Sequence, residues 1–400
     1  MAVTVPAGHK RTEVGVIPED WDVRRVVDIA ENKKTRFDDG DWVESEHITD
    51  KGFRLIQTGN IGVGVYIEKE TKKYIYKDSF EKLKCKELIV GDVLICRLAD
   101  PAGRACILPE LGEVKVITSV DVTIFRPNLD NFNRCYLVQF FSTPKWFELV
   151  TEQVGGTTHK RIARGALGKI PVAIPSCVEE QRLIAEALSD ADALIESLDQ
   201  LIAKKRQIKQ GAMQELLTGK RRLPGFGGEW EKRALGEIAP LQRGFDLPNS
   251  RLEPGLYPVV TSNGVLNHHI AFQVKGPGVV TGRSGTIGAV TFVEENFWPH
   301  NTSLWVTSFK ANDPKFVFYL YTRVGLERFA TGSGVPTLNR NNVHAFKVEI
   351  PVDKAEQTAI ATLLSDMDTE LAALASRLAK ARQIKQGMMQ ELLTGRVRLL

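Results

Sequence analysis

The sequence predicts a mixed α/β (α+β) protein with two similar globular domains and two long repeated helices, which pair as an antiparallel coiled coil in a pseudo-twofold arrangement. Two observations predict this architecture. Residues 206–219 and 382–395 are identical at thirteen of fourteen positions and differ only at Ala212 and Met388. The segments before the two repeats share the order of their turns, strand-like runs and helices, although most side chains differ. A long repeat of this kind indicates an architecture built from two copies of one unit.

We expect the parts of the chain in the order domain, helix, domain, helix. The predicted boundaries are 1–177 for the first domain, 178–219 for the first repeated helix, 220–352 for the linker and second domain, and 353–400 for the second repeated helix and tail. Each domain opens with a similar motif, which ends in Trp21 in the first domain and in Trp230 in the second. Each closes on a strand that ends in Ile-Pro.

Within each domain, short β-like runs alternate with turn residues. The pairs of segments that we align are 53–60 with 257–264, 91–97 with 278–283, and 119–124 with 302–306. An amphipathic helix is predicted late in each domain, around residues 135–149 and 315–329. A glycine-rich turn then precedes the last strand. The two domains therefore share a skeleton and differ in their side chains.

Each repeated element is predicted to be one helix of about forty residues, which is about 60 Å long. Apolar or small residues recur in steps of four and three, as in a heptad seam. The seam positions are Ile184, Leu188, Ala191, Ile195, Leu198, Ile202, Ile208, Ala212 and Leu216 in the first copy, and Ile360, Leu364, Met367, Leu371, Leu374, Leu378, Ala381, Ile384, Met388 and Leu392 in the second. The helices should start after Pro175 and Pro351 and end at Gly219 and Gly395, where glycine can adopt a left-handed cap conformation. Because a helix cannot bury such a stripe against itself, we expect the two stripes to pack together.

Composition sets wide bounds. The 400 residues are 43% hydrophobic and 26% charged, which suits two or three globular domains. With 53 basic and 49 acidic residues the net charge is only +4, so a nucleic-acid surface would consist of local patches. The five cysteines lack CxxC spacing and are expected to be reduced thiols. Neither a membrane span nor a signal-peptide core is present in the sequence, so a cytoplasmic location is expected.

Two domains with one skeleton and different side chains are expected to perform the same task on different targets. If the target is DNA, two readers joined by stiff helices require a split site with a fixed gap. Polar turn residues can bond to base edges, and basic residues can contact phosphate or guanine. The expected DNA contacts are Gln57, Thr58, Asn60, Arg97, Arg104, Thr118, Ser119, Thr157, Thr158, Lys160, Arg161, Arg164, Arg243, Ser262, Asn263, Arg283, Ser284, His300, Asn301, Ser333, Asn339, Arg340 and Asn341. Any one of these turns can be a turn alone, but their recurrence at equivalent places in both domains favours a role in recognition.

Several motifs occur in one order along the whole chain. They are the two-domain, two-repeat plan, the Pro-Glu-Asp-Trp opening at 18–21, the Gly-Thr-Thr and Gly-Ser-Gly turns at 156–158 and 332–334, and the Gln-Glu-Leu-Leu-Thr-Gly helix ends. In this combination the chain resembles the specificity subunit of type I restriction-modification systems. The resemblance implies that each domain is a target recognition domain that reads half of a bipartite site through the major groove.

The same resemblance implies the partners. The repeated helices would form the spacer and dock two methyltransferase (modification) subunits, through Gln207, Gln210, Gln214, Gln383, Gln386 and Gln390. Those subunits would carry S-adenosylmethionine and flip an adenine out of double-stranded DNA for methylation. Restriction subunits would bring ATP- and magnesium-dependent translocation and cleavage. No cofactor, metal or membrane is expected for this chain itself.

The chain departs from a simple repeat at its end, because it stops at Leu400, where the first copy runs on into Pro224. Residues 1–16 are therefore expected to continue the second copy in space.

Two other functions stay open from the residues alone. The amino-methyltransferase tetrad, the GxGxxG motif and the phosphate loop are missing from the sequence. The nearest approach to a nuclease is Asp100 followed by Glu113 and Lys115, the order of a metal-dependent Asp…Glu-x-Lys site, which often arises by accident. His268, His269 and His300 could be metal ligands, although histidines that face solvent or phosphate are commoner. A self-contained metal-dependent nuclease and a coiled-coil scaffold without DNA are thus the alternatives to a non-catalytic recognition subunit.

Overall fold

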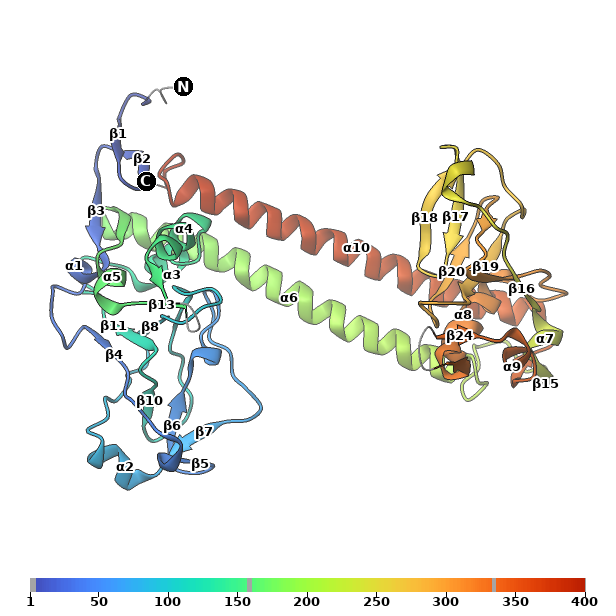
Figure 1. The fold of residues 1–400 in the computed structure, drawn as a ribbon, viewed down its shortest axis with the longest axis horizontal. Helices are drawn as coiled ribbons and strands as arrows, with labels where there is room; N and C mark the ends of the chain where they lie inside the picture. The colour runs from blue at the N-terminus through green and yellow to red at the C-terminus, as the bar shows by residue number, and fades with distance from the viewer. Residues whose placement is uncertain (1–4, 157–159, 333–335, 400) are drawn as a thin grey trace. The chain divides into compact units, whose positions relative to one another are not determined.

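The computed structural model describes residues 5–156, 160–332 and 336–399. The chain divides into two compact units (Figure 1). Unit 1 comprises Met1–Glu196 and Ala379–Leu400, and unit 2 comprises Ser197–Leu378. Each unit therefore holds one globular domain and a part of both long helices. The mixed α/β class and the two similar domains that the sequence predicts are confirmed.

Unit 1 begins with a hairpin of strands β1 (His9–Thr12) and β2 (Gly15–Pro18). Its further strands are β3 (Trp21–Arg25), β4 (Phe37–Asp39), β5 (Ile48–Thr49), β6 (Phe53–Ile56), β7 (Lys73–Ile75), β8 (Val93–Cys96), β9 (Ala105–Ile107), β10 (Val116–Thr118), β11 (Val122–Phe125), β12 (Val154–Gly155), β13 (Arg161–Ile162) and β14 (Pro171–Pro175). Its short helices are α1 (Val26–Ile29), η1 (Ser45–His47), η2 (Thr58–Asn60), α2 (Lys77–Lys82), α3 (Arg134–Phe140), α4 (Pro144–Glu152) and α5 (Arg164–Gly168).

Unit 2 repeats this order with fewer elements. Its strands are β15 (Trp230–Ala234), β16 (Leu241–Arg243), β17 (Tyr257–Thr261), β18 (Gly264–His269), β19 (Gly278–Gly282), β20 (Val290–Val293), β21 (Trp298–Pro299), β22 (Ser303–Val306), β23 (Ala330–Thr331), β24 (Thr337–Leu338) and β25 (Lys347–Pro351). Its short helices are α7 (Leu235–Ile238), η3 (Asn249–Arg251), α8 (Pro314–Val324), η4 (Leu326–Phe329) and α9 (Arg340–His344).

The sheets of the two units have the same topology where the sequence segments were aligned. Sheet order β4-β11-β8-β9 in unit 1 corresponds to β16-β22-β19-β20 in unit 2, and all neighbours are antiparallel. In the second sheet β6 pairs in parallel with β10, as β17 does with β21. The central strands β8 and β11 are buried along their whole length and are apolar or β-branched throughout, as fully buried strands require. The predicted correspondence of the two domains is confirmed.

The similar openings of the two domains have a structural reason. Strand β3 pairs antiparallel with β14 and places Trp21 opposite Pro175, while β15 pairs with β25 and places Trp230 opposite Pro351. The first and last strands of each domain are thus neighbours, and the long helix comes directly after them. Trp21 is fully buried in the unit 1 core.

The two predicted amphipathic helices are shorter than expected. Residues 135–149 form two helices, α3 and α4, because Pro144 lacks the N–H that a continuing helix needs. The hydroxyl of Thr143 caps α4 by accepting a hydrogen bond from the Trp146 N–H at 3.1 Å. In unit 2, α8 ends at Gly325, whose φ of 68° is left-handed, and a short 3-10 turn follows.

The long helices match their prediction closely. Helix α6 spans Val178–Leu216 and α10 spans Lys354–Leu392, each with 39 residues. Gly219 and Gly395 lie just beyond their ends with φ values of 70° and 71°, so the predicted left-handed glycines are confirmed. Among the described residues, no helix combines the length and apolar character needed to cross a bilayer.

The helices run antiparallel within each unit. In unit 1, Lys385 of α10 pairs with Asp192 of α6 at 2.5 Å, and Ile184 and Leu188 share a core with Leu392. In unit 2 the equivalent lysine, Lys209, pairs with Asp368.

In unit 2 the two helices exchange these roles. Leu216 from the end of α6 shares a core with Ile360 and Leu364 from the start of α10. The antiparallel pairing predicted from the repeated stripe is therefore observed within both units.

The seam prediction is wrong at one repeated position. Ile208 and Ile384 occupy the same place in the two copies, and they are 47% and 52% exposed. The glycines three residues further along, Gly211 and Gly387, have open space where a side chain would begin. The helix face that carries these residues is therefore turned away from the core of its unit.

Equivalent arginines, one after each long helix, bind a buried glutamate at the start of the other long helix. Arg398, after α10, donates to the carboxylates of Glu180 and Asp20 at 2.8 Å, and its guanidinium lies 6.0 Å from the Trp21 ring centroid. Arg222, after α6, makes the matching bond to Glu356 at 2.6 Å. Arg398 and Arg222 therefore occupy equivalent places in the two copies, and each binds the equivalent buried glutamate.

Candidate nucleic-acid interface

In unit 1, the loops at one end of the two sheets are joined by backbone hydrogen bonds. The Ala99 N–H donates to the Lys160 carbonyl at 3.0 Å, and the Ile162 N–H donates to the Arg97 carbonyl at 3.0 Å. The Ser119 N–H donates to the Ile56 carbonyl at 3.1 Å. We call this set the unit 1 loop cluster: the turn 57–61, the loop 97–104, the loop 119–121 and the hairpin of β12 and β13.

Unit 2 joins its own loops through the same backbone bonds. The Leu338 N–H donates to the Arg283 carbonyl at 2.8 Å, and the His300 N–H donates to the Val260 carbonyl at 2.8 Å. The Arg283 N–H donates to the Thr302 carbonyl at 2.8 Å, as that of Arg97 does to Asp121 in unit 1. The unit 2 loop cluster is the turn 261–264, the loop 283–289, the loop 300–302 and the hairpin of β23 and β24.

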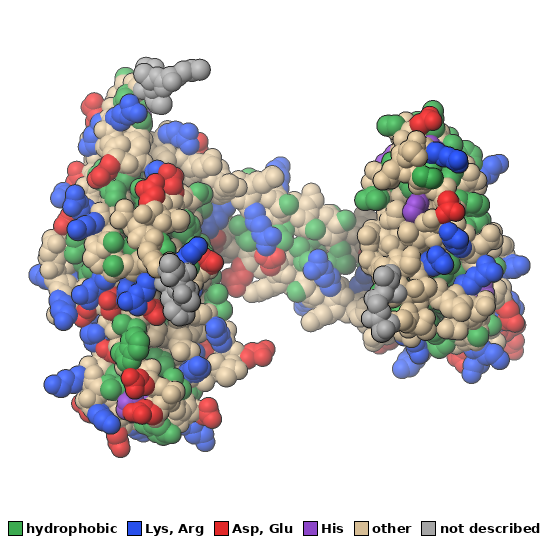
Figure 2. Space-filling view, in the orientation of Figure 1, with side chains coloured by type: hydrophobic (Ala, Val, Ile, Leu, Met, Phe, Trp, Pro, Cys, Tyr) green, Lys and Arg blue, Asp and Glu red, His purple; other side chains and the backbone are tan. Residues whose placement is uncertain are grey.

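Many of the predicted DNA contacts lie at the surface of these clusters or close beside them. Those classed as exposed are Lys160, Arg161, Arg243, Asn263, Asn339, Arg340 and Asn341, and those partly exposed are Gln57, Thr58, Ser119, Arg164, Arg283, Ser284, His300 and Asn301. On the face drawn in Figure 2, basic and acidic side chains are interspersed over each unit, which fits local contacts better than one broad basic field.

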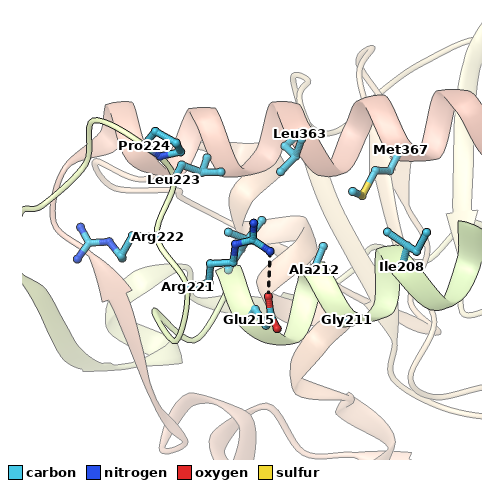
Figure 3. Close-up of a pocket in the computed structure, with 11 residues that line it drawn as sticks. Ile208, Gly211, Ala212, Glu215, Arg221, Arg222, Leu223, Pro224, Leu363 and Met367 are labelled. Atoms are coloured by element: carbon cyan, nitrogen blue, oxygen red, sulfur yellow. Dashed lines mark ion pairs between the residues drawn. The ribbon is translucent and has the colours of Figure 1, made fainter.

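The repeated face of the long helices is a second candidate surface. All six glutamines predicted to bind partners are exposed. Beside them in unit 2 lies a groove of about 440 Å³ between the end of α6, the segment 221–224 and the start of α10 (Figure 3). Ala212, Leu363 and Met367 make its floor apolar, and an ion pair of 3.6 Å between Arg221 and Glu215 lies at its rim.

The one residue that differs in the repeat is located at this groove. Ala212 lines it in unit 2 and also packs against the core there, and Met388 packs against the core of unit 1. On the facing helix the sizes are reversed, because Leu363 in unit 2 stands where Ala187 stands in unit 1. In both units the larger of these two side chains therefore lies on α10.

Comparison with known proteins identifies the family. The family model described as type I restriction modification DNA specificity domain matches residues 18–206 and 227–382. The chain belongs to this family. It is 24% identical to the putative type I restriction enzyme MjaX specificity subunit of Methanocaldococcus jannaschii, an alignment that covers 98% of this chain and 96% of the relative. It is 23% identical to the MjaVIII specificity subunit of the same organism, over 96% and 94%.

Solved structures share the fold of this specificity-domain family member. The S subunit of a type I restriction-modification system from M. genitalium superposes with a TM-score of 0.63 at 17% identity, covering 93% of this chain and 96% of that one. A chain from a structural study of complex assembly and conformational transition in the type I system gives 0.54 at 14% identity, covering 95% and 99%. The predicted resemblance is confirmed, and with it the role of a type I specificity subunit that recognises DNA and is not itself an enzyme.

The contacts made by the predicted nuclease residues also differ from those of a metal site. Glu113 accepts a hydrogen bond from the Tyr74 hydroxyl at 3.1 Å, and the Lys115 ammonium lies 4.1 Å from the Phe80 ring centroid. His269 is buried and bonded to the backbone of Glu253. Over residues 5–156, 160–332 and 336–399, no cluster of three or more His, Cys, Asp or Glu side chains is arranged to hold a metal ion.

Three predicted DNA contacts are corrected because their side chains are buried. Arg97 is 4% exposed, and its guanidinium donates to the carbonyls of Ile162 and Val120 at 3.2 and 2.6 Å. Asn60, also 4% exposed, closes its turn by accepting from the Gln57 N–H at 3.0 Å. The buried Thr118 hydroxyl donates to the Ile56 carbonyl at 3.0 Å. These residues shape the loops.

Three more predicted contacts are turned toward the protein. Ser262 is 8% exposed, and the Ser119 hydroxyl is buried, so both point inward. Arg104 is partly buried and bonded to carbonyl groups. Thr157, Thr158 and Ser333 lie outside the described residues.

Sequence reasoning missed the carboxylates that hold the basic residues. Asp121 pairs with Arg161 at 3.2 Å, and Asp246 pairs with Arg243 at 3.1 Å. Both arginines are about half exposed, and exposed pairs of this kind contribute about 0–1 kcal/mol, so a phosphate can replace the carboxylate at little cost. Asp38 pairs with Arg164. The run Asp38-Asp-Gly-Asp41 and the spacing of Arg243 and Asp246 were signals for such partners in the sequence.

Proposed function

We propose that each unit of this specificity subunit reads one half of a bipartite DNA site, and that partner subunits methylate and cleave the DNA. One observation carries the proposal: the two loop clusters share a hydrogen-bonded backbone but expose different side chains. A common frame with different polar groups is what two readers of different base sequences need, because base-edge contacts carry the sequence information. The exposed arginines and lysines beside the frame would position the DNA backbone.

The partner sites in this proposal are the repeated faces of α6 and α10. Exposed residues are not constrained by the core of a unit, yet Gln207, Ile208 and Gly211 recur unchanged as Gln383, Ile384 and Gly387. One partner that binds twice accounts for this identity. We assign these faces to two methyltransferase subunits, which would supply S-adenosylmethionine, while restriction subunits would use ATP and magnesium. All of these partners would meet the chain in the cytoplasm, where the DNA is.

A map of methylated adenines tests the proposed function. The candidate methyltransferase partner is expressed in cells with and without this chain, and adenine methylation is mapped genome-wide. We expect methylation at a split motif with a fixed gap only when the chain is present. A variant with alanine at both Arg161 and Arg340 tests the proposed DNA contacts. It should lower methylation at the motif while leaving complex assembly unchanged.

The alternatives give different results. If both proteins are expressed and assemble but methylation is unaffected by the chain, the recognition proposal is wrong. A scaffold without DNA would fail to retain DNA even at low salt, whereas the specificity subunit should bind DNA with an affinity that falls steeply as salt rises.

A further inference from the structure

We propose that Arg104 is a positioning residue that holds the loop cluster of unit 1 in its reading conformation, so that the base preference of one half-site depends on it. The inference rests on the proposed function and deepens it. Arg104 was predicted to contact DNA, but its guanidinium is directed at the protein backbone.

The guanidinium of Arg104 donates to four carbonyl oxygens. Its Nε donates to Ile61 at 2.7 Å, and its Nη2 donates to Thr58 at 3.1 Å. Its Nη1 donates to Pro101 at 2.8 Å and to Leu98 at 3.3 Å. An arginine has five N–H groups, so at least four of them are occupied within the protein.

These four carbonyls belong to two different loops. Thr58 and Ile61 lie at the two ends of the turn that carries Gln57 and Thr58, whereas Leu98 and Pro101 lie in the loop after β8. Leu98 in turn forms a β-bridge with Arg161 of the hairpin. The Arg104 side chain therefore ties the turn to the loop after β8, and the backbone of that loop is in turn bonded to the hairpin that carries Arg161.

The chemistry of the site requires an arginine. The four acceptors surround a planar group, which presents its donors in a fixed fork. Lysine has three donors on one nitrogen and could satisfy only part of the set. Neutral side chains offer fewer donors still, and the freed carbonyls would then turn toward water and change the shape of the turn.

Unit 2 has no arginine at the equivalent place. Ala289 precedes β20 where Arg104 precedes β9. Because the side chain of alanine has no hydrogen-bond donor, the effect of Arg104 should be confined to the half-site that unit 1 reads.

The test uses the full chain assembled with its methyltransferase subunits. Methylation rates are measured for the wild type, R104A and R104K on the mapped site and on sites with one changed base pair in either half. We expect R104A to lose about 5- to 150-fold of the discrimination at one half-site, the range that a mismatched base pair normally produces, with the other half-site unchanged. R104K should retain an intermediate discrimination.

The matched control is another arginine of unit 1. Arg126 donates to both carboxylate oxygens of Asp92 at 2.7 Å and to the Glu87 carbonyl at 3.0 Å, away from the loop cluster. R126A should lower the melting temperature of unit 1 and leave the base preference of both half-sites intact.

Two outcomes would overturn the inference. One is wild-type discrimination in R104A. The other is an equal loss at both half-sites that follows the melting temperature, as R126A would show if destabilisation alone mattered. If the wild-type complex methylates no split motif at all, the proposed function is wrong, and the role of Arg104 in base preference falls with it.

Discussion

At the residue scale, the equivalent arginines after the long helices show how one buried charge can determine the stability of a unit. Glu180 is 1% exposed and accepts hydrogen bonds from Arg398 and from the Trp21 indole. The second carboxylate on Arg398, Asp20, is 62% exposed and contributes much less. The carboxylate neighbours raise the pKa of Arg398, and the hydrogen bond from Arg398 lowers that of Asp20. The buried glutamate is therefore the partner that matters.

We predict that R398A lowers the free energy of unfolding of unit 1 by about 1–3 kcal/mol, because it leaves the Glu180 carboxylate buried without its cation, while the one-third exposure of Arg398 keeps the loss below that of a fully buried pair. Hydrogen exchange, followed separately over the two units, measures this effect. The double variant E180Q/R398A should recover part of the loss, since a neutral amide costs less to bury. Faster exchange in unit 2 as well as in unit 1 would contradict the local role of the pair.

His344 makes the stability of unit 2 sensitive to pH. Its Nε2 accepts a hydrogen bond from the Leu241 N–H at 2.8 Å, which requires the neutral ring. Burial, and then the charge of Arg340, lower the pKa of His344 from its ordinary value near 6.5. Below that pH the unfolded chain takes up a proton that the folded unit resists, so the contribution of His344 is complete above pH 6.5 and is lost as the pH falls toward the lowered pKa.

Thermal unfolding of unit 2 between about pH 7.5 and 5.5 checks this sign. The melting temperature should fall on acidification in the wild type, and H344Q should flatten that dependence, because glutamine can accept the Leu241 bond without titrating. A wild-type curve that rises toward acid pH, or an H344Q curve equally steep, would show that another group controls this range.

Single residues were also where the sequence was least informative. Arg97 and Arg161 read alike in the sequence as basic residues beside a turn, yet one is buried under carbonyl groups and the other is half exposed. Burial depends on which loops meet in space, and no local pattern records that. The side chain of Arg104 was assigned to DNA for the same reason.

At the element scale, periodicity predicted the long helices almost to the residue. A stripe of 39 residues with a glycine at its end leaves few alternatives. The prediction of one helix around 135–149 was too long, because the apolar pattern continues across the break at Thr143-Pro144. Periodicity also cannot tell which of two apolar faces meets the partner helix, and so Ile208 and Ile384 were placed in the seam.

These exposed isoleucines give the clearest test of the repeated faces. We predict that I208D/I384D weakens binding of the methyltransferase subunit at least tenfold, because a carboxylate would enter an apolar contact. Isothermal titration with the intact chain measures it. A372D, which adds one charge at an exposed position of α10 before the near-identical stretch 382–395, is the control. If I208D/I384D binds the partner as tightly as A372D and the wild type do, the partner docks elsewhere.

At the scale of the whole molecule, unit 1 is built from two distant parts of the sequence, Met1–Glu196 and Ala379–Leu400, whereas unit 2 is the continuous stretch Ser197–Leu378. The core of unit 1 takes Ile184 from the start of α6 and Leu392 from the end of α10, and that of unit 2 takes Leu216 and Ile360 in the reverse order. Residues more than two hundred positions apart along the chain must meet before unit 1 is closed. Each copy thus helps to complete a core, and under the proposed function it also offers a partner face, so two demands would keep the repeats nearly identical.

If α6 and α10 are the spacer of a bipartite reader, their length should set the gap in the DNA site. Inserting four residues at facing positions of both helices adds about 6 Å and rotates the helix beyond the insertion by about 40° more than a full turn. With about 3.4 Å per base pair, the mapped gap should grow by one or two base pairs while the half-site sequences stay the same. Methylation mapping of the assembled variant complex provides the readout. An insertion in one helix only is the control, since it shifts pairs such as Lys209 and Asp368 out of register and should prevent assembly. A paired insertion that assembles and methylates with the original gap would show that the helices do not determine the spacing.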